Sequence, residues 1–91
     1  MAAEQLKTLI AHYLTAEADA AEDFCNQYMD RFEELCNELE NEVEAKTYET
    51  YDDVRWICDA YENNEDIRKQ DAYCLDAGQL KQKLSALYRQ L

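Results

Sequence analysis

The 91-residue sequence contains no proline and a single glycine, Gly78. Tight β-hairpin turns and phosphate-binding loops both depend on glycines at set positions. The near absence of glycine therefore excludes the glycine-rich nucleotide-binding motifs. It favours helices that are joined by short polar loops.

Histidine is equally scarce, because His12 is the only one, and it has no evident local partner for acid–base catalysis. Tyr48–Asp59 is acidic but lacks the central glycine and the alternating acids of a calcium loop. The Glu-x-x-His pairs of di-iron bundles are also missing. We therefore expect no catalytic residue, no cofactor and no metal ligand, and we expect that the protein is not an enzyme.

Long apolar runs are absent too, since none approaches the roughly 20 residues that span a bilayer. The first turns of the chain lack the basic start and small-residue cleavage site of a secretory signal. We expect a cytoplasmic protein with no membrane partner. The four cysteines have spacings that match no zinc motif, and we expect them to be small buried thiols: Cys25, Cys36, Cys58 and Cys74.

Basic residues are few, because 9 Lys and Arg face 21 Asp and Glu, and the net charge is -12. Residues 30–66 contain fourteen acids and three bases, and so they carry eleven of these negative charges. A concentrated negative field repels nucleic acid and accelerates encounter with a basic partner. The charge predicts a basic protein partner and no direct binding of nucleic acid.

Apolar residues at helical spacing predict a first helix from about Ala3 to Leu14. Asp19 has the character of an N-cap for a second helix, because Glu22 stands three residues on as the other half of a capping box. This second helix is long and reaches about Val43. Its apolar stripe faces a core, and six acids lie on the opposite, solvated side: Asp30, Glu33, Glu34, Glu38, Glu40 and Glu44.

The apolar pattern lapses over Ala45–Glu49. Thr50, followed by Asp53, then supplies the start signal of a third helix. We expect Asn63 and Asn64 to end this helix, since asparagine tolerates the left-handed conformation that terminates helices.

A polar connection at residues 62–72 leads to a last helix, where Asp76 and Gln79 form a further capping box. Each of the four helices has one apolar stripe, and such helices can bury their stripes only around a shared core. The sequence predicts an all-α fold, an antiparallel four-helix bundle. We expect a single domain over residues 1–91.

Trp56 is the most informative single side chain. On the third helix it points roughly 100° or more away from the apolar stripe and shares its side with several acids. A large aromatic ring among carboxylates is the expected composition of an interface anchor. The alternative is that the ring covers a small cluster with the segment around Tyr48. With the acids of the helix end and its loop, the predicted partner-binding residues are Asp52, Asp53, Trp56, Asp59, Glu62, Glu65 and Asp66.

Three stretches carry a family resemblance: LIAHYLTAEADAAEDF (Leu9–Phe24), AYENNEDIR (Ala60–Arg68) and YCLDAGQLKQKLSALYRQL (Tyr73–Leu91). They resemble the immunity proteins of the colicin D type, small bacterial self-protection proteins that block a tRNA-cleaving toxin. In that family an aromatic residue ends the third helix, an acidic loop follows, and an aromatic-x-hydrophobic-Asp segment opens the last helix. Tyr61, residues 62–66 and residues 73–76 occupy these places, whereas the acidic stretch 39–49 departs from the family pattern.

The resemblance implies a four-helix bundle whose acidic groups imitate tRNA phosphates and occupy the toxin's basic active-site cleft. Glu62 and Asp66 match the acids of the family's toxin-facing loop best, and Asp59 matches less closely. The expected partner is a basic, tRNA-cleaving toxin nuclease domain, bound one to one in the bacterial cytoplasm. Proteins similar to this family accompany both bacteriocins and contact-dependent inhibition systems, and the sequence does not separate the two.

Two other classes of protein stay open. An acidic helical adaptor or self-associating module, with no toxin partner, would use its acids only for solubility. A metalloenzyme built on carboxylates alone would retain a metal ion after purification. A stable homodimer that buries Trp56 would favour the module.

Overall fold

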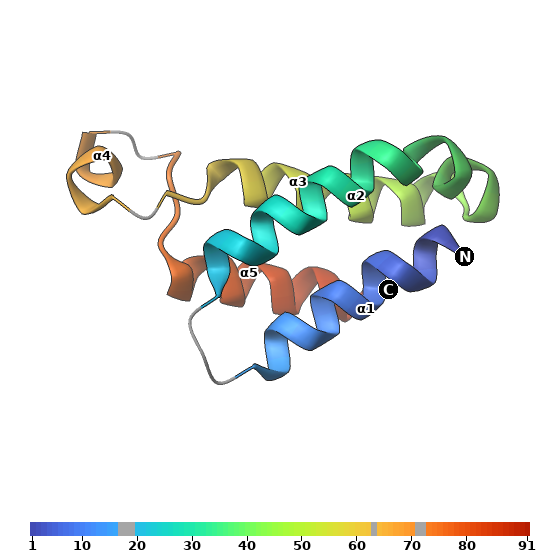
Figure 1. Ribbon diagram of the computed structural model, residues 1–91, viewed down its shortest axis with the longest axis horizontal. Helices are drawn as coiled ribbons and strands as arrows, with labels where there is room; N and C mark the ends of the chain where they lie inside the picture. The colour runs from blue at the N-terminus through green and yellow to red at the C-terminus, as the bar shows by residue number, and fades with distance from the viewer. Residues whose placement is uncertain (17–19, 63, 71–72) are drawn as a thin grey trace.

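The computed structural model describes residues 1–16, 20–62, 64–70 and 73–91. Its helices are α1 (Ala2–Thr15), α2 (Ala21–Glu42), α3 (Ala45–Ala60), α4 (Glu65–Gln70) and α5 (Ala77–Tyr88). All but the short α4 run alternately in opposite directions, and each of these four contacts two of the others (Figure 1). The predicted all-α, antiparallel four-helix bundle is confirmed.

Each bundle helix buries one face only. The largest fully buried side chains come from all four helices: Leu6, Ile10, Tyr28, Leu39, Val54, Leu80 and Leu84. Burying an apolar side chain of this size stabilises a fold by about 1.5–3 kcal/mol. The outer faces are polar, and within the described residues no helix combines the length and the apolar character that crossing a membrane requires.

A row of aromatic rings joins three helices inside the bundle. It starts at Tyr13 of α1, passes through Phe24, Tyr28 and Phe32 of α2 and ends at Tyr48 of α3. Successive ring centroids are 4.6, 5.8, 6.2 and 5.9 Å apart. These separations lie in the favourable range for aromatic pairs. The row therefore fixes α1 and the start of α3 against α2.

Two tyrosine hydroxyls add polar links between the helices. The hydroxyl of Tyr28 donates to the carbonyl oxygen of Tyr51 at 2.8 Å, which joins α2 to α3. The hydroxyl of Tyr51 donates to the carbonyl oxygen of Ala3 at 3.2 Å, which joins α3 to α1. Burial is the main reason that the pKa of each phenol lies above its ordinary value.

The capping box predicted for the last helix is confirmed. The backbone amide of Gln79 donates to the Asp76 carboxylate at 2.8 Å, and the amide of Asp76 donates to the Gln79 side chain at 3.0 Å. The cap predicted for α2 falls on Asp19, which lies outside the described residues. Ala20 occupies the N-cap position of α2 and provides no side-chain hydrogen bond there.

The predicted start of the third helix is wrong. Residues 45–49 are helical, and the break between α2 and α3 lies at Val43 and Glu44, where the backbone is extended. Thr50 is buried inside α3, and its hydroxyl donates to the carbonyl oxygen of Lys46 at 3.2 Å instead of capping the helix. The contact of Tyr48 with Phe32 gives this first turn an apolar anchor, which explains why it folds as helix.

The predicted end of the third helix is also wrong. The helix stops at Ala60, and Tyr61 continues in an extended conformation. Asn63 lies outside the described residues. Asn64 has no left-handed backbone, and its side-chain oxygen accepts from the amides of Asp66 at 2.9 Å and Ile67 at 3.4 Å. Asn64 therefore starts α4 within the predicted polar connection.

The α4 loop (residues 62–74) is closed at its base by backbone hydrogen bonds. The amide of Glu62 donates to the carbonyl of Leu75 at 3.0 Å, and the amide of Leu75 donates to the carbonyl of Ala60 at 2.8 Å. Arg68 also donates to the carbonyl oxygen of Glu62 at 2.6 Å. As a result α4 projects beyond one end of the bundle (Figure 1).

Candidate partner-binding surface

Trp56 lies on the outer side of α3 and is 49% exposed. Asp52, Asp53 and Asp59 stand four residues before, three before and three after it, which are the positions that neighbour a residue on a helix surface. The prediction that Trp56 points away from the core is confirmed. We call these four residues the α3 surface; its role in binding stays a prediction.

Arg55 modifies this surface in a way that we did not anticipate. Its guanidinium lies 4.9 Å from the centre of the Trp56 ring and forms an ion pair with Asp52 at 3.0 Å. Asp52 is therefore partly neutralised, and the Trp56 ring is held by a cation–π contact. The spacing of Asp52 and Arg55, three residues apart on a helix, is the signal that could have predicted the pair.

Asp53 and Asp59 are the carboxylates of the α3 surface that remain open to a partner. Both are exposed, and within the part of the chain that the structure describes neither forms an ion pair. They lie on either side of Trp56 along the helix. An exposed aromatic ring is thus flanked by two carboxylates that form no ion pair with any described cation.

Glu62 has a structural role at the start of the α4 loop. It is only partly exposed, its carboxylate accepts from the amide of Asn64 at 3.1 Å, and its carbonyl accepts from Arg68. Together with Asp59 it lines a shallow groove of about 180 Å³ between α2 and α3. Glu62 therefore continues the α3 surface, but its carboxylate is already engaged in shaping the loop.

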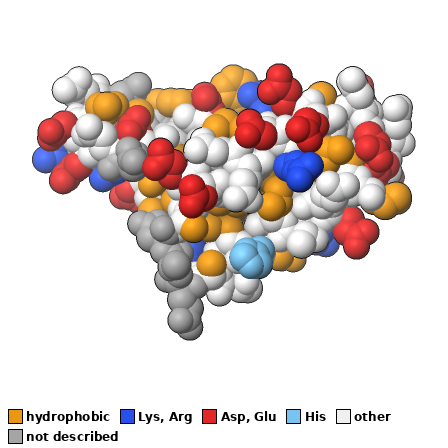
Figure 2. Space-filling view, in the orientation of Figure 1, with side chains coloured by type: hydrophobic (Ala, Val, Ile, Leu, Met, Phe, Trp, Pro, Cys, Tyr) orange, Lys and Arg blue, Asp and Glu red, His pale blue; other side chains and the backbone are white. Residues whose placement is uncertain are grey.

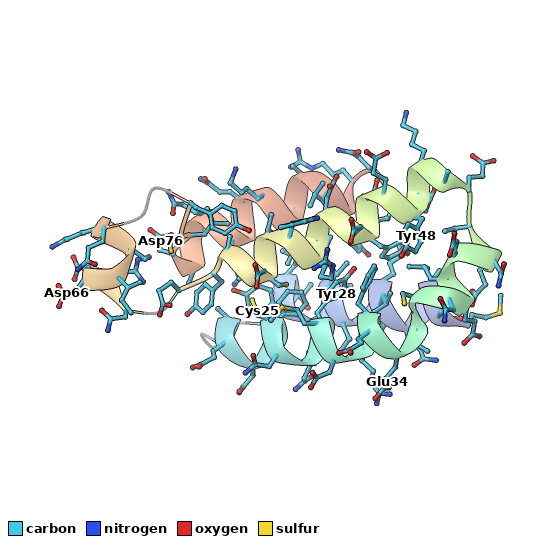
Figure 3. All side chains as sticks on the ribbon, turned by 90° about the horizontal axis from the view of Figure 1, so that it is seen from above. Cys25, Tyr28, Glu34, Tyr48, Asp66 and Asp76 are labelled. Carbon is cyan, nitrogen blue, oxygen red and sulfur yellow. The ribbon has the colours of Figure 1, made fainter. Side chains whose placement is uncertain are left out.

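Glu65 and Asp66 lie apart from the α3 surface, on α4. Glu65 is exposed and forms an ion pair with Lys69 at 3.5 Å. Asp66 is exposed, and Figure 3 shows it beyond the end of the bundle. The seven predicted residues therefore divide into the α3 surface, Glu62 at its edge, and a separate pair on α4.

The α4 loop also exposes two large side chains that our prediction missed. Ile67 is 45% exposed and Tyr73 is 51% exposed. Ile67 follows directly after Glu65 and Asp66 in an otherwise polar helix, and an apolar residue in such a stretch is a usable signal for a contact site.

The acids of α2 are distributed differently. Asp30, Glu33, Glu34, Glu38 and Glu40 are all exposed, as predicted for a solvated face. Figure 3 shows Glu34 pointing away from the bundle. On the side of the molecule drawn in Figure 2, acidic side chains are scattered from the α4 end to the opposite end and are not gathered into one patch. No exposed tryptophan accompanies them, because the chain has only one.

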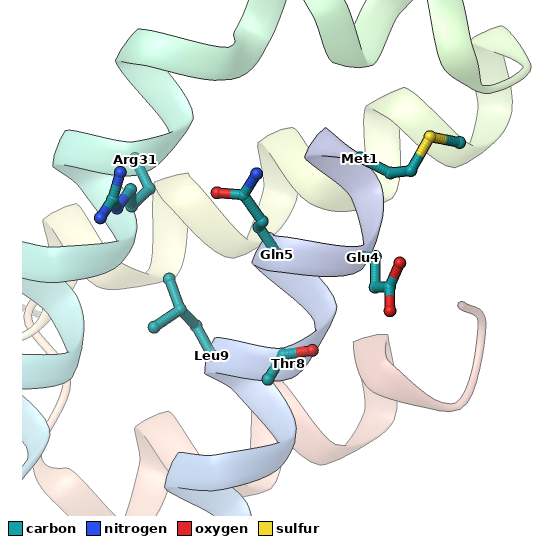
Figure 4. Close-up of a pocket in the computed structure, with 6 residues that line it drawn as sticks. All are labelled: Met1, Glu4, Gln5, Thr8, Leu9 and Arg31. Atoms are coloured by element: carbon teal, nitrogen blue, oxygen red, sulfur yellow. The ribbon is translucent and has the colours of Figure 1, made fainter.

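A larger hollow than the groove between α2 and α3 lies elsewhere. It has a volume of about 370 Å³, and it is lined by the N-cap residue of α1, four residues of α1 and one residue of α2 (Figure 4): Met1, Glu4, Gln5, Thr8, Leu9 and Arg31. Arg31 pairs with Glu34 at 3.3 Å. The hollow contains none of the predicted residues.

His12 is exposed on α1 and lines a second hollow of about 210 Å³ that also contains Asp23. In the described ranges no hydrogen bond joins these two side chains. Within the same ranges no three His, Cys, Asp or Glu side chains are grouped so that they could hold a metal ion.

Comparison with known proteins identifies no relative. The chain matches no family model and shows no significant similarity to any curated protein or any solved structure. The geometry of the α3 surface and the resemblance of the three sequence stretches are therefore the basis for a functional proposal.

Proposed function

We propose that this protein is an immunity protein, a non-enzymatic inhibitor that binds a basic, tRNA-cleaving toxin nuclease one to one. The α3 surface occupies the cleft in which the nuclease normally holds RNA phosphates. The observation that carries the proposal is the half-exposed Trp56 between Asp53 and Asp59, two carboxylates that pair with no cation among the described residues. The resemblance to colicin D-type immunity proteins supports the same partner class.

The chemistry of the α3 surface suits a nuclease cleft. Lys and Arg side chains that bind phosphates also form strong charge-assisted hydrogen bonds with carboxylates. Asp53 and Asp59 supply such carboxylates. Trp56 supplies apolar area at the centre, and tryptophan is among the residues that contribute most to binding when an interface buries them.

A second copy of this chain is a less suitable partner for the α3 surface. In a symmetric dimer the same surface patch would face itself. Asp53 and Asp59 would then approach identical carboxylates, within a chain whose net charge is -12. Such like-charge contacts oppose association, so the observed charges favour a basic partner over the self-associating module.

The experiment is a titration with a tRNA-cleaving nuclease domain of the colicin D type, with a double variant and a matched control. Asp53→Asn with Asp59→Asn removes two charges from the α3 surface, and Asp30→Asn with Glu38→Gln removes two from the outer face of α2. We expect the first variant to weaken binding by about 2 kcal/mol, roughly thirtyfold. The second should change the dissociation constant less than about threefold.

Equal losses in the two double variants would show that only net charge matters and would contradict the assignment of the α3 surface. Sedimentation of the free protein tests the alternative function. A stable homodimer that dissociates on Trp56→Ala would support the adaptor or self-associating module in place of the inhibitor.

A further inference from the structure

Two of the four cysteines form a buried pair between α2 and α3. Cys25 of α2 is 3% exposed, and Cys58 of α3 is 2% exposed. The two helices contact one another, and Figure 3 shows Cys25 on the side of α2 that packs against α3. Both residues line the groove of about 180 Å³ that also contains Asp59 and Glu62.

The two thiols interact directly. A hydrogen bond with Cys25, with burial as a second cause, raises the pKa of the Cys58 thiol well above its ordinary value. The Cys58 thiol is therefore protonated near neutral pH, and neither Cys25 nor Cys58 is part of a disulfide. The other two cysteines differ from this pair, because Cys36 and Cys74 are only partly buried.

We infer that Cys25 and Cys58 are a site of reversible oxidation, at which a peroxide converts the two thiols into a disulfide that joins α2 to α3. The pair has what this reaction needs: a second thiol beside the first, and a groove that a small oxidant can enter. The inference does not depend on the proposed function.

The reaction balances without any further component. Peroxide oxidises one thiol to a sulfenic acid and releases one water. The second thiol then displaces the hydroxyl group, which forms the sulfur–sulfur bond and releases a second water. Two thiols lose two electrons and two protons in total, and the peroxide is reduced to water. Because both thiols are buried, the first step is slower than at an exposed thiolate.

The test uses the full-length protein with Cys36→Ser and Cys74→Ser, which leaves only the buried pair. The folded protein is treated with hydrogen peroxide, alkylated and analysed as an intact mass and after trypsin. We expect a mass loss of about 2 Da, loss of both alkylatable thiols, and a linked pair of peptides spanning residues 8–31 and 56–68. Treatment with a reducing agent should restore both thiols.

The single changes Cys25→Ala and Cys58→Ala in this background are the controls, and each should abolish the linked peptides. Recovery of the two peptides unlinked, with sulfinic acid or alkylated sulfur on each, would overturn the inference. Linkage found only between two chains would also overturn it. The linked peptides are sought in the protein that keeps both Cys25 and Cys58. A control variant that is destabilised therefore does not affect the result.

Discussion

The carboxylate of Glu42, the last residue of α2, accepts a hydrogen bond of 2.8 Å from the backbone amide of Ala2, the first residue of α1. The two residues are far apart in the sequence. The first amides of a helix have no partner within the helix, and they carry its positive dipole end. Glu42 therefore acts as a cap that α2 provides for α1. Met1, in the N-cap position, provides no side-chain bond.

Removal of this cap should destabilise the fold. We expect Glu42→Ala to lower the free energy of unfolding by about 1 kcal/mol, the usual cost of losing an N-cap. Glu38→Ala, at an exposed position of the same helix, is the matched control and should change it by less than about 0.5 kcal/mol. Urea unfolding followed by circular dichroism measures both. Equal effects of the two substitutions would argue against a capping role.

The hydrogen bond that the Tyr28 hydroxyl donates should stabilise the fold in addition to the packing of the ring. Tyr28→Phe leaves the buried carbonyl of Tyr51 without this donor, and we expect a loss of about 1–2 kcal/mol in the free energy of unfolding. Tyr48→Phe is the control, because Tyr48 packs on Phe32 through its ring and no hydroxyl hydrogen bond of Tyr48 is described. A loss in Tyr48→Phe as large as in Tyr28→Phe would contradict the role of the Tyr28 bond.

Tyr28 and Tyr51 predict that the stability of the fold depends on alkaline pH. Burial raises the pKa of Tyr28 and of Tyr51 above the ordinary value of 10.0. The unfolded chain therefore releases these protons at lower pH than the folded protein does. The stabilisation is complete below about pH 10 and is lost as the pH rises through the raised folded values.

We expect the midpoint of urea unfolding to begin to fall above about pH 9, where the Cys58 thiol loses its proton only in the unfolded chain. The fall should steepen above about pH 10, where Tyr28 and Tyr51 do the same. Tyr28→Phe removes one of these protons, so the fall should be less steep in that variant. An identical slope in the wild type and in Tyr28→Phe would show that Tyr28 does not contribute to the alkaline transition.

The α4 helix depends on a cap that belongs to the loop itself. Asn64→Ala removes the acceptor for the amides of Asp66 and Ile67. We expect amide hydrogen exchange in residues 65–70 to accelerate, while the free energy of unfolding of the bundle changes by less than about 0.5 kcal/mol. Gln70→Ala, exposed in the same helix, should leave exchange at its first turn unchanged. Unaltered exchange in Asn64→Ala would contradict the cap.

Local signals in the sequence predicted the bundle well. The stripe of each long helix and the capping box at Asp76 involve residues within one or two turns of one another, and both appear in the structure as expected. The predicted start of α3 was wrong for a long-range reason, because the packing of Tyr48 against Phe32 overrides the start signal at Thr50. The cap that Glu42 provides for Ala2 also joins distant residues, and no local pattern predicts it.

The candidate site also combines features that local spacing predicts with features that depend on distant residues. Helical periodicity alone predicted that Trp56 is exposed beside Asp53 and Asp59. It could not predict that Glu65 and Asp66 lie apart from them, because their position depends on how Tyr61 and Leu75 pair at the base of the α4 loop. The neutralisation of Asp52 by Arg55 follows from local spacing, and sequence reasoning could have included it.

Loss of the Trp56 ring tests the central proposal most directly. The measurement is the dissociation constant of the complex with a tRNA-cleaving nuclease domain of the colicin D type, together with the protein concentration that halves tRNA cleavage. For Trp56→Ala we predict a loss of at least about 2 kcal/mol in binding, roughly thirtyfold, with a matching loss of inhibition and an unchanged helical spectrum. Unchanged binding and inhibition by Trp56→Ala would contradict the account, because the α3 surface would then not be the part that occupies the nuclease.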